Sequence, residues 1–125
     1  MKNRSLLARI GFAVAGWREA WARERSFRTQ ACFAGLALLA LLILQPPPIW
    51  WAVVAMTCAL VLALELVNSA LEGLIDLLHP AIHPEIKVIK DMLAGAVLLI
   101  SCAALIVGAA LVLADLRARM PALLS

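Results

Sequence analysis

The sequence predicts an all-α membrane protein, in which an N-terminal amphipathic surface helix precedes three membrane-spanning helices. Apolar residues make up 65% of the 125 residues, whereas soluble domains contain roughly one half. Two runs, residues 29–64 and 92–114, contain no charged residue. A spanning helix needs about 20 apolar residues, and Pro46-Pro47-Pro48 divides the longer run because proline cannot continue a helix. We therefore expect a single membrane domain, residues 1–125, with spans at about 29–45, 49–76 and 88–114.

The N-terminal segment carries seven of the 11 Lys and Arg residues, which alternate with apolar side chains. A basic amphipathic helix of this kind lies in the membrane surface, and we predict one over residues 5–28. A cleavable signal peptide is the alternative, since Ala13-Val14-Ala15 resembles a cleavage site. Arg9 interrupts an apolar stretch that is already short for a signal peptide, so the surface helix is favoured.

The basic residues also indicate how the chain is oriented. Nine of the 11 lie in the N-terminal segment or in residues 77–91, and the remaining two are Arg117 and Arg119. Because cytoplasmic segments are enriched in Lys and Arg, the N-terminus and the 65–91 region are expected to face the cytoplasm, where ATP is available. The positive charge is thus explained by topology, and no nucleic-acid partner is expected.

Polar residues interrupt the end of the second predicted span. Glu65, Asn68, Glu72 and Asp76 recur at helical spacing and share one face of a helix. Acidic side chains at a membrane boundary are costly, and they usually face a bundle interior or water at a functional site. This stripe is the strongest functional signal in the sequence.

Carboxylates near one boundary, together with Lys90, fit the chemistry of phosphoryl transfer. Mg²⁺ prefers one or two carboxylates plus phosphate oxygens, and a further carboxylate can take a proton from a hydroxyl group. Glu24 shares a helical face with Trp17, Trp21 and Arg28. Periodicity alone favours a solvated Glu24, or one paired with Arg28, over one that points at the acidic stripe.

Three segments resemble the prokaryotic diacylglycerol kinase family in order and spacing. They are Glu24-Arg25-Ser26-Phe27-Arg28, Glu65-Leu66-Val67-Asn68-Ser69-Ala70-Leu71-Glu72 and Lys90-Asp91-Met92. The likeness extends from about Phe12 to Leu113. It implies a three-span kinase of the bacterial inner membrane, a homotrimer with active sites shared between subunits, which uses MgATP to phosphorylate a lipid alcohol.

The resemblance also implies roles for single residues. Glu65 matches the catalytic base, and Glu24 and Glu72 match the pair that binds Mg²⁺, which reverses the preference from periodicity for a solvated Glu24. The other matched positions are polar or nucleotide-contacting residues of the active site: Asn68, Asp76, Lys90 and Asp91, with Lys90-Asp91 beside the phosphates, His83 in the loop that closes over the nucleotide, and Phe12 facing it. The sequence departs from the family pattern at Ser5, Ser26 and Gln30, and Gln30 stands where the enterobacterial form has an acid.

The expected reaction is conversion of 1,2-diacylglycerol to phosphatidic acid. The alternative is an undecaprenol kinase, because residues 83–91 are closer to that branch of the family. His79 and His83 flank a proline-rich loop that suits either a phosphate contact or a plain solvated loop. A non-catalytic oligomer or proton-conducting bundle is less favoured, since it needs neither Lys90-Asp91 nor Glu24.

Overall fold

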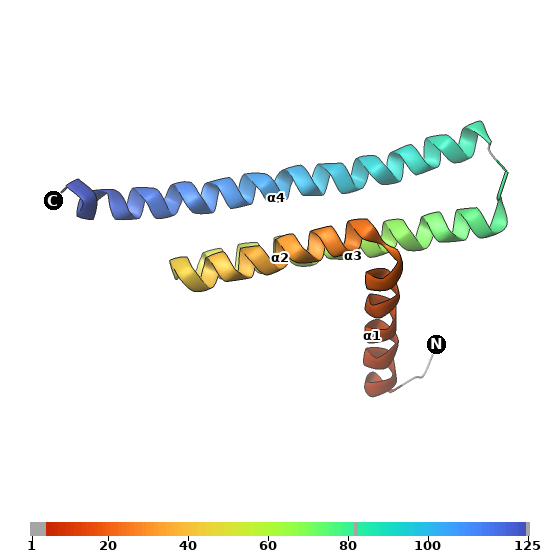
Figure 1. Ribbon diagram of the computed structural model, residues 1–125, viewed down its shortest axis with the longest axis horizontal. Helices are drawn as coiled ribbons and strands as arrows, with labels where there is room; N and C mark the ends of the chain where they lie inside the picture. The colour runs from red at the N-terminus through yellow and green to blue at the C-terminus, as the bar shows by residue number, and fades with distance from the viewer. Residues whose placement is uncertain (1–4, 82, 125) are drawn as a thin grey trace.

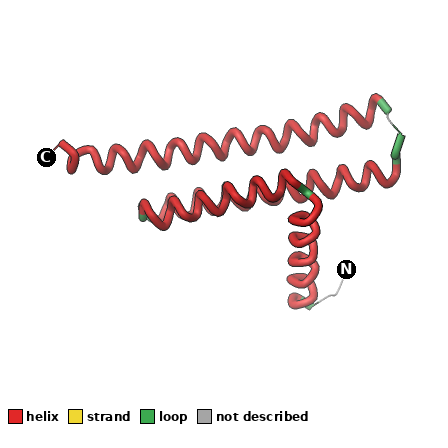
Figure 2. Tube along the Cα trace, in the orientation of Figure 1, coloured by secondary structure: helices red, strands yellow, loops and turns green. Residues whose placement is uncertain are grey.

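The protein is a bundle of helices, seen in a computed structural model that describes residues 5–81 and 83–124 (Figures 1 and 2). The described helices are α1 (Leu6–Arg23), α2 (Arg25–Leu44), α3 (Pro48–Leu78) and α4 (Pro84–Leu124). Three of them, α2, α3 and α4, are long and apolar enough to cross a membrane. The prediction of an all-α protein with three such helices is confirmed.

Helix α3 is the centre of the arrangement, because it packs against both α2 and α4. The long axes of α2, α3 and α4 run in nearly the same direction, whereas α1 lies crosswise to them (Figure 1). The α1–α2 junction and the α3–α4 loop lie toward one end of the bundle, and the C-terminus lies at the other (Figure 1). Basic residues of α1 and of the first turns of α4 therefore gather toward the same end.

The turns follow from local sequence. Gln45 ends α2 in the left-handed conformation (φ 48°). Pro48 is the first residue of α3, a position that proline suits because its missing N–H is not needed there. The predicted reversal at residues 45–48 is therefore present. The predicted loop from His79 to Pro84 is also present in its described residues, with Pro84 opening α4; Ile82 lies outside them.

The first helix is shorter than the predicted range of 5–28. It ends at Arg23, and Glu24 has an extended backbone (φ −108°, ψ 108°) before α2 begins at Arg25. The N–H of Glu24 donates to the carbonyl of Ala20 at 2.8 Å, while the carbonyl of Glu24 accepts from the N–H of Arg28 at 3.2 Å. One residue therefore closes α1 and opens α2, and the first long apolar helix begins four residues earlier than the predicted span.

Apolar packing within the chain is sparse. Leu41, Val54 and Leu111 form a small buried cluster, with Trp50 and Trp51 packed against it. Most large apolar side chains of the described residues are exposed. This is expected of spanning helices, whose outer faces contact lipid or another protein chain. Among the described residues, Glu65 is the one buried polar or charged side chain.

Candidate active site

The acidic stripe of α3 passes from a buried to an exposed environment. Glu65 is 2% exposed, Asn68 and Glu72 are half-buried, and Asp76 is exposed. Counted from Pro48, the roughly 20 residues that cross a bilayer end close to Asn68. The stripe therefore begins just inside the apolar region and leads out of it toward the α3–α4 loop.

Glu65 lines an open groove to which α2, α3 and α4 all contribute. Helix α3 runs antiparallel to both α2 and α4 and packs against both, so residues at similar distances from the connecting turns lie at similar heights. The groove has a volume of about 420 Å³ and is lined by Arg25, Ser26, Thr29 and Gln30 of α2, Glu65 of α3, and Ala94, Val97, Leu98 and Ser101 of α4.

Two neighbours of Glu65 were not predicted as site residues. Gln30 lines the same groove as Glu65, and its side chain is close enough to act on the Glu65 carboxylate. The Nε2 atom of Gln30 also donates to the Oγ of Ser101 at 3.0 Å, which joins α2 to α4. The sequence feature that could have indicated this contact is that Ser101 is the single hydroxyl residue in the apolar run 92–114.

Glu24 and Glu72 are both close enough to Glu65 to act on it electrostatically. Glu24 makes no side-chain cap bond to α2 and is half-buried, so its carboxylate stays available to the site. Sequence periodicity favoured a solvated or Arg28-paired Glu24. In the structure the helix instead breaks at Glu24, so this residue no longer shares a helical face with Trp17 and Trp21.

The oxygen-bearing side chains near Glu72 suit Mg²⁺ if a phosphate group also binds the ion. No group of three or more His, Cys, Asp or Glu side chains in the described part of the chain is arranged to hold a metal ion. Mg²⁺ needs only one or two carboxylates if phosphate oxygens and water complete its shell. Among the described residues, the buried Oδ1 of Asn68 has no hydrogen-bond partner, so a further oxygen acceptor is available one helical turn from Glu72 on α3.

Lys90 and Asp91 take different partners. The Nζ of Lys90 contacts the Oδ1 of Asp76 at 2.7 Å, between α4 and α3, and the Nζ of Lys87 contacts the Oδ2 of Asp91 at 2.7 Å. Adjacent helical residues point about 100° apart, so Lys90 faces α3 and Asp91 does not. Glu72 also lies within electrostatic range of Lys90. Because partly exposed ion pairs contribute about 1 kcal/mol or less, a phosphate can replace Asp76 as the partner of Lys90.

Phe12 and His83 are not brought to the groove by this chain. Phe12 is on α1, twelve residues before Glu24 and so about 18 Å away along the helix. His83 precedes α4, where its Nδ1 accepts a hydrogen bond from the N–H of Glu85 at 3.1 Å. The structure thus shows His83 capping a helix, and a nucleotide contact by either residue remains an expectation.

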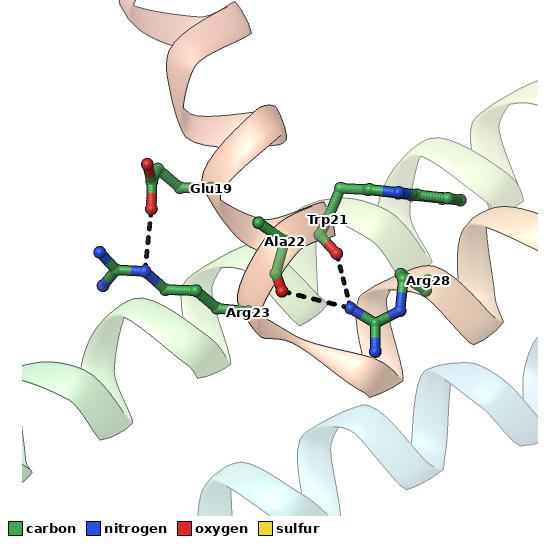
Figure 3. Close-up of polar contacts among 5 residues, drawn as sticks. All are labelled: Glu19, Trp21, Ala22, Arg23 and Arg28. Atoms are coloured by element: carbon green, nitrogen blue, oxygen red, sulfur yellow. Dashed lines mark hydrogen bonds and ion pairs between the residues drawn. The ribbon is translucent and has the colours of Figure 1, made fainter.

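Arg28 fixes the junction that carries Glu24 (Figure 3). Its Nη1 donates to the carbonyl of Trp21 at 2.8 Å and to that of Ala22 at 3.4 Å. These carbonyls belong to the last turn of α1 and have no partner within that helix. A cation at this end also interacts favourably with the helix dipole. Arg28 therefore holds α1 crosswise to α2.

We expect Arg28→Ala to loosen this junction. Loss of the two bonds should cost on the order of 1 kcal/mol at this partly exposed position, which corresponds to roughly fivefold faster trypsin cleavage after Arg23 and Arg25 in detergent micelles. Glu19→Gln is the matched control, because it removes only the neighbouring Arg23–Glu19 pair, whose side chains are 77% and 65% exposed (Figure 3). Equal cleavage rates for wild type and Arg28→Ala would contradict this role.

Comparison with known proteins identifies the family. The model of the family described as prokaryotic diacylglycerol kinase matches residues 11–112, which include the groove and the acidic stripe. The chain belongs to the prokaryotic diacylglycerol kinase family. The expected family is thereby confirmed, and membership makes the chain a membrane lipid kinase with ATP as its co-substrate.

Relatives within the family carry two different names. A diacylglycerol kinase of Synechocystis is 42% identical over 118 residues, covering 93% of this chain and 67% of the relative. An undecaprenol kinase of Bacillus subtilis is 32% identical over 85 residues, covering 68% of this chain and 69% of the relative. A diacylglycerol kinase of Escherichia coli K12 is 29% identical over 94 residues, covering 75% and 77% respectively.

Proposed function

We propose that this diacylglycerol kinase family member transfers the γ-phosphoryl group of MgATP to the free hydroxyl of 1,2-diacylglycerol, giving phosphatidic acid and ADP. The observation that carries the proposal is the buried Glu65 carboxylate, which opens into a groove between α2, α3 and α4 beside Glu24 and Glu72. The relatives from Synechocystis and Escherichia coli, both named diacylglycerol kinase, support the choice of lipid.

Glu65 is the proposed general base. It accepts the proton of the lipid hydroxyl as the hydroxyl oxygen forms a bond to the γ-phosphorus and the bond from that phosphorus to the β–γ bridging oxygen breaks. ADP leaves with the bridging oxygen, and the proton on Glu65 passes to water after product release. The groove beside Glu65 is also lined by the apolar residues Ala94, Val97 and Leu98 of α4, which suits a substrate dissolved in the membrane.

The negative charge of the phosphates would be balanced by groups nearer the exposed end of the acidic stripe. Glu24 and Glu72 would hold Mg²⁺, with Asn68 as a neighbouring oxygen donor, and the ion would neutralise phosphate charge when bound. Lys90 supplies a further positive charge when a phosphate oxygen replaces Asp76 as its ion-pair partner. The family resemblance would place Asp91 beside the phosphates; Asp91 pairs with Lys87, which keeps a second cation at this end of α4.

The proposal includes a homotrimer in the inner membrane, with shared sites and with the N-terminus in the cytoplasm. The side placed in the cytoplasm carries nine of the 11 Lys and Arg residues. The sparse packing within one chain leaves apolar faces for neighbouring copies. A mass of one or two chains for the protein component in detergent solution would exclude the trimer.

Undecaprenol is the alternative substrate, because one relative is named undecaprenol kinase. The test is a mixed-micelle assay in which γ-labelled MgATP is supplied with diacylglycerol or with undecaprenol in parallel. We expect label in phosphatidic acid, at a kcat/KM at least roughly tenfold above that for undecaprenol, a difference of about 1.4 kcal/mol in transition-state binding. A preference for undecaprenol would reassign the substrate, and no label in either lipid from folded protein would favour a non-catalytic bundle.

A further inference from the structure

We propose that Gln30 and Ser101 are positioning residues for the Glu65 carboxylate, linked by a hydrogen bond between α2 and α4. The inference rests on the proposed function, because it assigns these residues to the orientation of the proposed general base. Neither residue belongs to the three motifs that resemble the family.

The link connects three helices through one amide. Gln30 Nε2 donates to Ser101 Oγ at 3.0 Å, and Gln30 lines the same groove as Glu65, where its side chain acts on the Glu65 carboxylate. A glutamine amide has two N–H groups, so it can serve both oxygens at once. Gln30 and Ser101 are both half-buried, and both line the groove that Glu65 also lines.

Glu65 is surrounded by like charge and has no ion-pair partner among the described residues. Glu24 and Glu72 act on Glu65 with like charge. None of the ion pairs found among the described residues includes Glu65. A neutral amide can hold the carboxylate in one orientation without forming the ion pair that a Lys or Arg would make. A general base has to be held within hydrogen-bond distance of the proton that it removes.

Ser101 determines where the amide of Gln30 points. Its hydroxyl lies on α4, and the hydrogen bond draws the Gln30 side chain from α2 toward α4, across the groove that Glu65 lines. Without this acceptor the amide keeps its volume but loses its orientation. The consequence for the reaction is a slower chemical step with unchanged binding of either substrate.

The test compares kcat and KM for lipid and MgATP in mixed micelles. We expect Ser101→Ala to lower kcat about tenfold while both KM values stay within about twofold. Ser101→Thr keeps the Oγ and should return kcat to within about twofold of wild type. Gln30→Met keeps the side-chain length and should lower kcat to a similar extent. The double variant should be no slower than Gln30→Met alone, because both changes break the same link.

Thr57→Val is the matched control. It also removes one hydroxyl from an apolar helix, but Thr57 Oγ1 donates to the carbonyl of Val53 within α3, and Thr57 does not line the groove. This variant should keep the wild-type kcat. If Ser101→Ala does not purify with the wild-type mass, Gln30→Met provides the same comparison.

Three results would overturn the inference: an unchanged kcat for Ser101→Ala and Gln30→Met, multiplicative losses in the double variant, or a loss confined to KM. Failure of the proposed function has a different signature. In that case wild type transfers no phosphate to lipid, or Glu65→Gln retains full turnover, whatever the variants of Gln30 and Ser101 do.

Discussion

Glu65→Gln should abolish lipid phosphorylation, with kcat falling about 10²- to 10⁴-fold, the range that general bases contribute. Glutamine has the same shape but cannot accept the proton of the lipid hydroxyl. The protein should remain folded, because the variant removes a charge from a side chain that is 2% exposed, and burying a neutral amide costs less than burying a carboxylate. The measurement is turnover of γ-labelled MgATP in mixed micelles, with the thermal unfolding temperature recorded in the same detergent.

The control for this variant is Glu19→Gln, which makes the same chemical change on the exposed surface of α1. It should retain wild-type turnover, and both variants should have the mass of the proposed trimer. Near wild-type turnover of Glu65→Gln would remove this residue from the reaction. A loss of turnover together with a smaller oligomer would assign Glu65 a structural role.

The second large effect concerns Mg²⁺. Glu72→Gln and Glu24→Gln should each raise the free Mg²⁺ concentration for half-maximal activity by roughly tenfold or more, because each removes one of two proposed carboxylate ligands. Excess Mg²⁺ should restore part of the lost turnover. The measurement is initial rate against free Mg²⁺ at fixed ATP and lipid concentrations.

Asp115→Asn is the matched control for the Mg²⁺ titration. It also removes one carboxylate, but Asp115 pairs with Arg119 near the C-terminal end of α4, whereas Lys90, near the start of α4, contacts Asp76 one turn from Glu72. Its Mg²⁺ dependence should equal that of wild type. If Glu24→Gln and Glu72→Gln lower kcat with an unchanged Mg²⁺ requirement, these residues do not hold the metal.

The helices and the acidic stripe could be predicted from the sequence because both depend on local patterns. Apolar runs of spanning length and the triple proline determine α2, α3 and α4. The spacing of Glu65, Asn68, Glu72 and Asp76 puts these residues on one face of any helix that contains them.

The break at Glu24 could not be predicted in the same way. No glycine or proline marks it, and helical periodicity continues through it. The α1 carbonyls left open by the break are satisfied by Arg28 from the next helix. This break also decides the setting of Glu24, since a continuous helix would have kept it on the face of Trp17 and Trp21.

Contacts between distant positions form the other part of the site that the sequence did not reveal. Gln30 and Ser101 are 71 positions apart on different helices, and neither is charged. Lys90 and Asp91 are adjacent in sequence, yet their side chains bind Asp76 and Lys87 respectively. Only the packing of α2 and α4 against α3 determines these partners.

The most direct test of the central claim is the stoichiometry of phosphoryl transfer by the purified wild-type protein. ADP and lipid-extractable label from γ-labelled MgATP would be measured together, with and without diacylglycerol. We expect one phosphorylated lipid for each ADP and almost no ADP without lipid. ADP formation without lipid labelling, or no ADP from folded protein in the presence of diacylglycerol, would contradict the assignment of a lipid kinase site at Glu65.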